Sequence, residues 1–333
     1  MRLLLVLIIM MNLSIAKEIK VASYNVENLF DLRYDGSEYA EYIPNTKWQW
    51  NSKNYKKKLN NISKVISDVN PDIIALQEIE SLQALMDLRK ALKMSGAYYK
   101  YYAIAKAKNT NIKNAILSKI PIDSSKEISV TSSRRYRNIL EATFNIDGEK
   151  LYIFVNHSKA KSGSESKRII SAKALKKRLN ELGDKNILLV GDFNSDYDEY
   201  KNFLKSRKLN DTNGKTALQH TLQSVDENDN HITLHSLKHP YYYNPWIEID
   251  KSRMFTHKFR KYRHALDHIL ISSALHNKSG LEYKVGSFNR YDKSYVLKRN
   301  APFRWQRSRY APYHHTGKGF SDHLLVHVTL NTN

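Results

Sequence analysis

The sequence has no cysteine among its 333 residues. This absence excludes disulfide bonds, thiolate metal sites and a catalytic thiol. An exported protein of this kind must take its stability from a hydrophobic core, and 41% of the residues are hydrophobic, which is enough for a sizeable one. The chain also shows no repeat at a fixed period and no low-complexity linker, so a single domain is the simplest division.

Long hydrophobic runs are scarce too, and the one present lies at the N-terminus. There Arg2 precedes the apolar run Leu3–Ile15, and Ser14-Ile15-Ala16 offers small residues to a signal peptidase. The run is short for a transmembrane helix. We expect residues 1–16 to be a signal peptide and the mature protein to be secreted or periplasmic, with no stable membrane association. The alternative is a segment that stays attached as a membrane anchor.

Acidic residues are in deficit. The chain has 54 Lys and Arg against 33 Asp and Glu, a formal net charge of +21, and loss of residues 1–16 lowers this by one. The plain explanation is solubility and a lysine-rich codon usage. The other explanation is a polyanionic partner, either nucleic acid or an anionic membrane surface. The charge alone does not choose between them.

Short apolar runs typical of strands alternate with stretches of helical periodicity. The expected helices cover 55–70, 81–95 and 165–182, and the expected strands cover 19–25, 73–76, 115–118, 139–146, 151–155, 187–190, 265–272 and 324–330. Asp147-Gly148 predicts a hairpin, so parallel and antiparallel pairing should both occur in sheets covered by helices. Residues 213–263 are the least regular and should form long surface loops beside the functional site.

Six of these strands carry an acid, an amide or a histidine at one tip. One such tip is ordinary, because strands must end and Asn and Asp form turns readily. Six tips drawn from the same few residue types indicate a shared site. The segments are Ser23-Tyr24-Asn25-Val26-Glu27-Asn28, Gln77-Glu78, Asn156-His157, Gly191-Asp192-Phe193-Asn194, Leu266-Asp267-His268 and Ser321-Asp322-His323.

These residue types suit metal-assisted hydrolysis of a phosphate ester. Carboxylate and amide oxygens are the ligands that Mg²⁺ and Ca²⁺ prefer, and converging carboxylates repel one another unless a cation lies between them. Histidines add general acid and base chemistry near neutral pH, which a purely structural Ca²⁺ site does not need.

The six segments, in this order, closely resemble the endonuclease/exonuclease/phosphatase superfamily, to which DNase I and the neutral sphingomyelinases belong. The stretch Asn156-His157-Ser158-Lys159-Ala160-Lys161 is similar to its secreted bacterial nucleases. The resemblance implies a DNase I-like α+β fold, a four-layer sandwich of two mixed β-sheets packed face to face with helices outside. It also implies that residues 17–333 form a single catalytic domain.

The resemblance implies a role for each matched residue. Asn25, Glu78 and Asp322 would hold the metal, Mg²⁺ with Ca²⁺ or Mn²⁺ as alternatives. The catalytic group would comprise His157, Asp192, Asn194, Asp267 and His323. Within it, Asp192 and Asn194 would position the water and the phosphate, and Asp267 would orient His323. Arg137 would contact the phosphate together with Asn194, although Arg134 and Arg135 compete for that position.

One feature departs from the resemblance. DNase I has a glutamate that orients its first catalytic histidine near the position of residues 112–114, and the segment Ile112-Lys113-Asn114 contains no acid. The sequence leaves two candidates for orienting His157, namely Asn156 and a backbone carbonyl.

Nucleic acid, and DNA in particular, is the expected substrate. The stretches Arg134–Arg137 and Phe303–Tyr310 interleave cations with aromatic rings, a pattern suited to binding phosphates and bases. An ordinary solvent-exposed surface with half-buried aromatic residues would show the same pattern. No base-reading motif is visible, so we expect a monomeric and largely sequence-nonspecific endonuclease. One alternative is a sphingomyelinase-like phospholipid or inositol-phosphate phosphoesterase that would use Tyr241–Trp246 as an apolar hairpin. The non-enzyme alternative is a toxin or nucleic-acid-binding subunit on the same scaffold.

Overall fold

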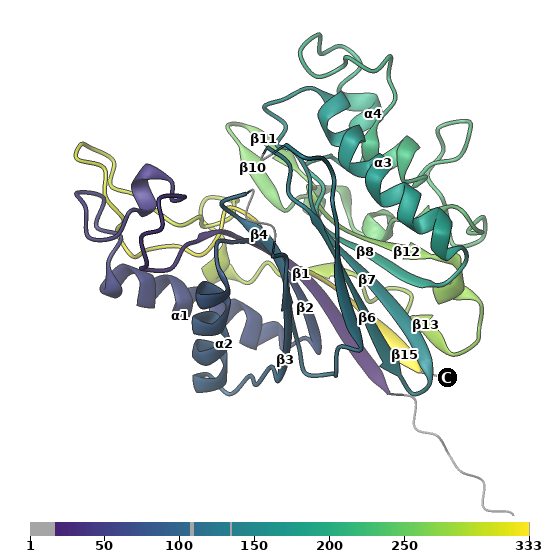
Figure 1. Cartoon of the computed structure of the whole chain (residues 1–333). Helices are drawn as coiled ribbons and strands as arrows, with labels where there is room; N and C mark the ends of the chain where they lie inside the picture. The colour runs from purple at the N-terminus through teal and green to yellow at the C-terminus, as the bar shows by residue number, and fades with distance from the viewer. Residues whose placement is uncertain (1–16, 107–109, 134, 333) are drawn as a thin grey trace, which may run out of the picture.

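The computed structural model describes residues 17–106, 110–133 and 135–332. Two β-sheets pack face to face, and helices cover the outer face of each sheet (Figure 1). This arrangement confirms the predicted four-layer α+β sandwich. The expected signal peptide lies outside the described residues and stays a prediction. The same holds for Arg134 as an alternative phosphate contact.

The two sheets are mixed and of similar size. The strands of the first sheet are β1 (Glu18–Leu29), β2 (Ile73–Ile79), β3 (Tyr101–Ile104), β4 (Lys113–Ser118), β13 (Leu281–Tyr283), β14 (Asn289–Arg290) and β15 (Val326–Thr332). Their order is β13-β15-β1-β2-β4-β3, with β14 paired to β15. The strands of the second sheet are β5 (Ser124–Ile128), β6 (Ile139–Ile146), β7 (Glu149–His157), β8 (Asn186–Asp192), β9 (Tyr242–Tyr243) and β12 (Asp267–Ser272). Their order is β5-β6-β7-β8-β12-β9.

Each sheet contains one parallel pair, and a long helix makes the connection in both cases. Helix α1 (Ser52–Val69) lies between β1 and β2 in the chain, and helix α3 (Glu165–Leu182) lies between β7 and β8. Parallel neighbours need such a crossover, whereas antiparallel neighbours can be joined by a tight turn. The predicted hairpin is of the second kind, since Asp147 and Gly148 join β6 to β7 with φ of 52° and 93°.

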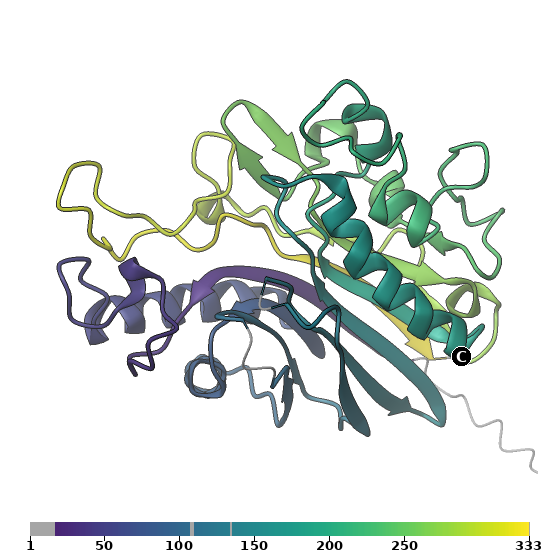
Figure 2. The ribbon, with the colours of Figure 1, turned by 45° about the horizontal axis from the view of Figure 1, so that its top comes forward.

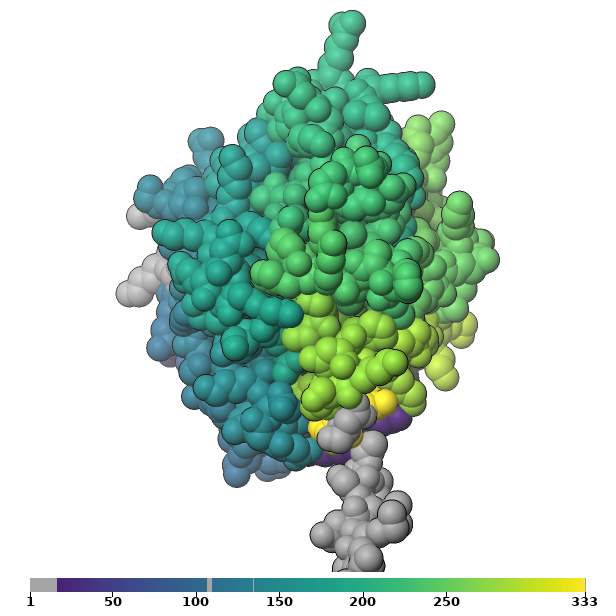
Figure 3. Space-filling view, turned by 90° about the vertical axis from the view of Figure 1, so that its right-hand side faces the viewer, coloured from purple at the N-terminus to yellow at the C-terminus, as the bar shows by residue number. Residues whose placement is uncertain are grey.

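Hydrophobic side chains fill three layers, one between the sheets and one between each sheet and its helices. Strand β8 contributes to two of them. Leu188 and Val190 face the layer between the sheets, whereas Ile187 and Leu189 face the layer beneath α3. The uninterrupted apolar run of this strand therefore reflects burial on both faces. Figure 3 shows the outside of the α3 layer, which α3 and the loops after β8 cover.

Residues 213–263 are more ordered than the sequence indicated, so the prediction of surface loops was wrong in part. Leu218 and Leu222 pack beneath α3, and Tyr243 and Trp246 lie between the sheets. The exposed apolar hairpin that the phospholipid alternative would need at Tyr241–Trp246 is absent from the described structure, because most of these side chains are buried. The segment ends in a hairpin, β10 (His257–Phe259) and β11 (Tyr262–His264), which does lie beside the candidate site.

Helix α2 (Leu82–Met94) packs with α1 against the first sheet. Among the described residues, none of the helices combines the length and apolar character that crossing a bilayer requires.

The contact between β7 and β8 gives a first prediction. Gly191 has φ of 133°, and a Cβ atom there would lie 2.0 Å from the carbonyl oxygen of Asn156. Gly191→Ala should lower the free energy of unfolding by about 3 kcal/mol or more, because a clash with backbone adds to backbone strain. Urea unfolding measures the loss.

Gly96→Ala is the matched control, because Gly96 also has a positive φ, 88°, but nothing lies within 4 Å of the added Cβ. It should cost only the backbone strain, about 1 to 2 kcal/mol. Equal losses in the two variants would contradict the close approach of the strands.

Candidate functional site

The polar strand tips meet at one end of the two sheets. The register places His157 beside Asp192 and Asp192 beside Asp267 in the second sheet, while Asn25 lies opposite Gln77 in the first. In Figure 2 the hairpin β10–β11 and the yellow loops that precede β15 extend from this end of the molecule. Because β12 runs antiparallel to β8, its beginning and the end of β8 lie at the same edge.

The backbone at these tips is irregular. Several non-glycine residues have left-handed φ between 49° and 67°, namely Glu27, Asn28, Glu78 and Asn194. The registers of β1 against β2 and of β2 against β4 both shift here. Such bulges redirect side chains and are common near active sites. One result is that the Asn28 amide donates to Glu78 Oε2 at 2.8 Å and fixes that carboxylate.

A tight turn at the end of β8 holds Asp192 and Asn194. The backbone amide of Asn194 donates to Asp192 Oδ1 at 2.9 Å. Phe193, between them, packs back into the layer beneath α3. The turn keeps both polar side chains at the site while the intervening ring anchors it to the core.

Asp267 and His323 form the shortest contact between predicted catalytic residues, with Asp267 Oδ2 2.7 Å from His323 Nδ1. This is the pairing expected from the sequence. His323 Nε2 lies 3.8 Å from Asp192 Oδ2. Burial alone would lower the pKa of His323, but the charges of Asp267 and Asp192 outweigh it and hold the pKa well above its usual range. His323 is therefore protonated near neutral pH.

His157 is in the opposite state. Its Nε2 lies 3.5 Å from Asp192 Oδ2 and 3.7 Å from Glu78 Oε1. Burial, together with the positive charge of Arg137, holds the pKa of His157 well below its usual range. The ring is therefore neutral, and its buried Nδ1 has no hydrogen-bond partner in the described part of the chain.

Asn156 does not orient the ring of His157, because its amide donates to the carbonyls of Phe154 and Val190 instead. Asn114 lies in the segment where the resemblance placed a glutamate, and it contacts the backbone of the strand that carries His157. Its Nδ2 donates at 3.1 Å to the carbonyl of Val155, two residues before His157, and its Oδ1 is buried without a partner among the described residues. Asn114 is a functional candidate that the sequence did not reveal.

Asn25 bridges carboxylates from the two sheets. Its Nδ2 lies 3.2 Å from Glu78 Oε1 and 3.1 Å from Asp192 Oδ2, while its oxygen accepts the amide of Glu27. Burial, reinforced by Asp267, raises the pKa of Asp192 to about 7. Burial and the charge of Asp322 also raise the pKa of Glu78. The site thus gathers more negative charge than it neutralises by itself.

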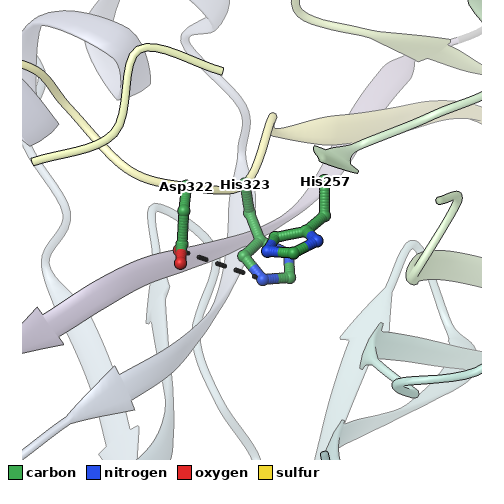
Figure 4. Close-up of side chains that lie close together, drawn as sticks. All are labelled: His257, Asp322 and His323. Atoms are coloured by element: carbon green, nitrogen blue, oxygen red, sulfur yellow. Dashed lines mark ion pairs between the residues drawn. The ribbon is translucent and has the colours of Figure 1, made fainter. Parts of the chain in front are cut away.

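Within the described part of the chain, two groups of three side chains have donor atoms within 4.8 Å of one another. They are His257, Asp322 and His323, drawn in Figure 4, and Asp192, Asp267 and His323. Asp267 Oδ1 is also buried without a partner in the described residues. This buried His and Asp cluster, rich in oxygen donors, is consistent with a divalent metal.

The three predicted metal ligands lie around the same cluster. Asn25 contacts Glu78, and the pKa of Glu78 responds to the charge of Asp322. Their assignment as ligands stays a prediction, and in this arrangement Asn25 presents its amide nitrogen to the carboxylates. A divalent metal held here would supply positive charge to a phosphate in the site.

Arg137 and Asn194, the predicted phosphate-binding residues, share one acceptor. Arg137 Nη1 and Asn194 Nδ2 donate to the carbonyl oxygen of Ser158 at 3.1 Å and 3.2 Å. Both line a chamber of about 1000 Å³ together with His157 and His323. Its outer wall includes Lys161, Lys208, Phe259, Arg260, Tyr262 and Arg263.

Three further residues lie beside the site: His257, to which sequence reasoning assigned no role, and Glu27 and Arg304, which it named only as parts of longer stretches. Arg304 Nη2 lies 2.6 Å from Glu27 Oε1 and 3.5 Å from Asp322 Oδ2. The ring of His257 lies 4.9 Å from that of His323, and burial lowers the pKa of His257 to about 4. Glu27 follows Asn25 by two residues, a spacing that could have identified it. His257 lies ten residues before Asp267, outside the predicted strands, and no comparable pattern marks it.

The match to known proteins is clearest at the level of the family. A family model described as the endonuclease/exonuclease/phosphatase family matches residues 20–332. The chain belongs to the endonuclease/exonuclease/phosphatase family. No curated protein matches its sequence significantly.

Solved structures share the fold of this family member at low sequence identity. A humanised TDP2 from D. rerio with 14 mutations is 14% identical, with a TM-score of 0.57 over 95% of this chain and 99% of that chain. A family protein from Bacteroides thetaiotaomicron is 16% identical, with a TM-score of 0.55 over 96% and 99% of the two chains. A mannosyl-6-phosphatase from the same organism is 16% identical, with a TM-score of 0.55 over 94% and 99%.

For a metal-dependent phosphoesterase of this family, we predict that the two histidines divide the proton transfers. Environments that move two titratable groups in opposite directions identify a base and an acid. Neutral His157 can accept a proton, whereas protonated His323, held by Asp267, can donate one. The site therefore contains both partners needed for acid-base hydrolysis at neutral pH.

Asp267→Asn tests this division. Loss of the Asp267 charge lowers the pKa of His323, so less of it is protonated at neutral pH. Turnover of a phosphoester substrate should fall about 10²- to 10⁴-fold. The alkaline limb of the pH–rate profile should move to lower pH, because that limb marks loss of the proton from His323.

Asp147→Asn is the matched control, since exposed Asp147 lies in the turn between β6 and β7, at the opposite end of the sheet. It should leave the rate and the profile unchanged. A rate for Asp267→Asn within threefold of the wild type would refute the role of the pair.

Proposed function

We propose that this chain is a secreted, metal-dependent phosphodiesterase that cleaves DNA as a largely sequence-nonspecific endonuclease. The observation that carries the proposal is the position of the two predicted phosphate-binding residues. Arg137 and Asn194 are tied to one carbonyl beside neutral His157, in a chamber whose outer wall is rich in Lys, Arg and aromatic rings. Such surfaces bind nucleic acid strands through their phosphates and bases.

In the proposed reaction, Asp192 and Asn194 position a water molecule and the scissile phosphate. His157 accepts a proton from the water as its oxygen attacks phosphorus, and His323 donates a proton to the leaving oxygen. Arg137 contacts the phosphate oxygens, where negative charge builds up in the transition state.

The net charge of +21 supports a polyanionic substrate. The phospholipid alternative has lost part of its support, because Tyr242, Tyr243 and Trp246 are buried and cannot enter a bilayer. The non-enzyme alternative does not account for two buried histidines held in opposite protonation states.

Two further properties are proposed with the activity. Residues 1–16 act as a signal peptide, which delivers residues 17–333 to the periplasm or the medium. The mature domain then works as a monomer without stable attachment to a membrane.

Purified residues 17–333 should nick supercoiled plasmid DNA with Mg²⁺ and then degrade it. EDTA should stop the reaction, and excess Mg²⁺ should restore it. His157→Ala should lower the rate about 10²- to 10⁴-fold, because the proton acceptor is lost. Gel assays of plasmid conversion measure all three effects.

His235→Ala is the control, because His235 is an exposed histidine away from the strand tips. Its rate should equal that of the wild type, and circular dichroism should show that both variants are folded. Sphingomyelin and a sugar monophosphate are assayed alongside. Turnover of either without DNA cleavage would overturn the substrate proposal, and undiminished cleavage by His157→Ala would overturn the site.

A further inference from the structure

Three connected hollows continue beyond Asp322, and all are rich in cations. The first has a volume of about 270 Å³, and five of its eight lining residues are Lys or Arg. The next two have volumes of about 340 Å³ and 550 Å³, and Arg304 lines all three. The cations of the first hollow are Lys258, Arg260, Lys298, Arg299 and Arg304. Asp322, its one acidic residue, belongs to the catalytic cluster.

Most of these cations are not neutralised by the protein. Arg304 pairs with Glu27 and Asp322, and it lines the hollows on the side next to the site. By contrast, Lys298 and Arg299 are exposed, and neither has a carboxylate within 4.0 Å in the described part of the chain. Unpaired cations lining a concave surface create a positive potential that attracts anions.

A tight hairpin presents Lys298 and Arg299. The backbone amides of Lys298 and Ala301 donate to each other's carbonyls at 2.8 Å and 3.2 Å, and Arg299 and Asn300 have φ of 53° and 54°. Two successive left-handed residues form a type I′ turn, which fixes the direction of both strands. The two cations are therefore held by ordered backbone rather than by a loose loop.

The segment that contains Arg304 and Trp305, which also lines the hollows, is anchored to the core as well. The amide of Trp305 donates to Glu27 Oε2 at 2.8 Å, and its indole donates to His315 Nδ1 at 2.8 Å. Gly319 allows the returning chain to pass close by, since a Cβ there would lie 1.9 Å from the carbonyl oxygen of Arg304. The surface is thus built before any ligand arrives, which lowers the cost of binding.

We propose that these hollows form a track for the phosphate backbone of a nucleic acid chain that continues from the scissile phosphate. The inference rests on the proposed function and makes it narrower, because a substrate must carry several phosphates to occupy the track. A sugar monophosphate has a single phosphate, which would occupy the catalytic site and leave no phosphate for the track. A flat bilayer suits a series of hollows leading to Asp322 less well than a linear polymer does.

The test compares a long and a short substrate. Lys298→Ala combined with Arg299→Asn removes both charges, and Asn tolerates the left-handed backbone at position 299. For a 20-nucleotide oligomer, kcat/KM at low salt should fall roughly tenfold or more through KM. The slope of log(kcat/KM) against log[salt] should become shallower by about 1.4 to 1.8 for two lost phosphate contacts. Hydrolysis of bis(p-nitrophenyl) phosphate, which is too short for the track, should stay within twofold.

Lys173→Ala combined with Lys177→Ala is the matched control. It removes two exposed charges from α3, which covers the outer face of the second sheet. It should leave kcat/KM for the oligomer and hydrolysis of the small diester unchanged. An equal fall for both substrates in the Lys298 and Arg299 variant, or an unchanged salt slope, would overturn the track.

The outcomes also separate the two proposals. DNA cleavage that does not respond to Lys298 and Arg299 overturns the track and leaves the nuclease intact. Absence of DNA cleavage by the wild type, with the small diester still hydrolysed, overturns the nuclease proposal and the track together. Loss of binding to phosphatidylserine vesicles, with oligonucleotide cleavage unchanged, would assign these cations to a membrane instead.

Discussion

Negative charge buried at the strand tips is the constraint on which this structure depends. Burial raises the pKa of several carboxylates here and their neighbouring charges raise it further, so that the pKa of Asp192 reaches about 7. The protein offsets part of this repulsion with the bridging amide of Asn25, the ion pair of Arg304 with Glu27 and the charge of His323. The remainder is the physical reason for a cation at the site. Strands buried on both faces supply the rigidity that holds such groups together.

The same arrangement makes two histidines chemically different. His323 lies against Asp267 and Asp192, whereas His157 has Arg137 nearby and an unpartnered Nδ1 among the described residues. Their pKa values move in opposite directions because carboxylates outweigh desolvation at His323, whereas a cation reinforces desolvation at His157. An acid and a base thus arise from one residue type.

In the proposed function, the strand tips supply the chemistry and the segments around them supply the substrate preference. A fold shared with TDP2 and with a mannosyl-6-phosphatase shows that this scaffold by itself does not specify a substrate. The segments surrounding the tips in this chain are the hairpin β10–β11 and the loops before β15. Both are dense in Lys, Arg and aromatic residues. Several residues of the hairpin, His257 among them, line the chamber, and Arg304 of the loops pairs with Asp322.

The sequence by itself determined the layers and the order of the strand-tip residues. The helix Glu165–Leu182 was predicted to its ends, and the hydrophobic run of β8 was correctly assigned to a buried strand, because periodicity and apolar runs are local properties. The prediction was less accurate for residues 213–263, where irregular segments are buried by contacts that no local pattern encodes. Asn114 and His257 were missed for a similar reason, and the contact of Arg304 with Asp322 was not foreseen although Arg304 lies in the predicted stretch Phe303–Tyr310. Only the tertiary structure decided which histidine is neutral, which carboxylates repel and where cations remain unpaired, because these properties depend on distances and burial between segments far apart in the chain.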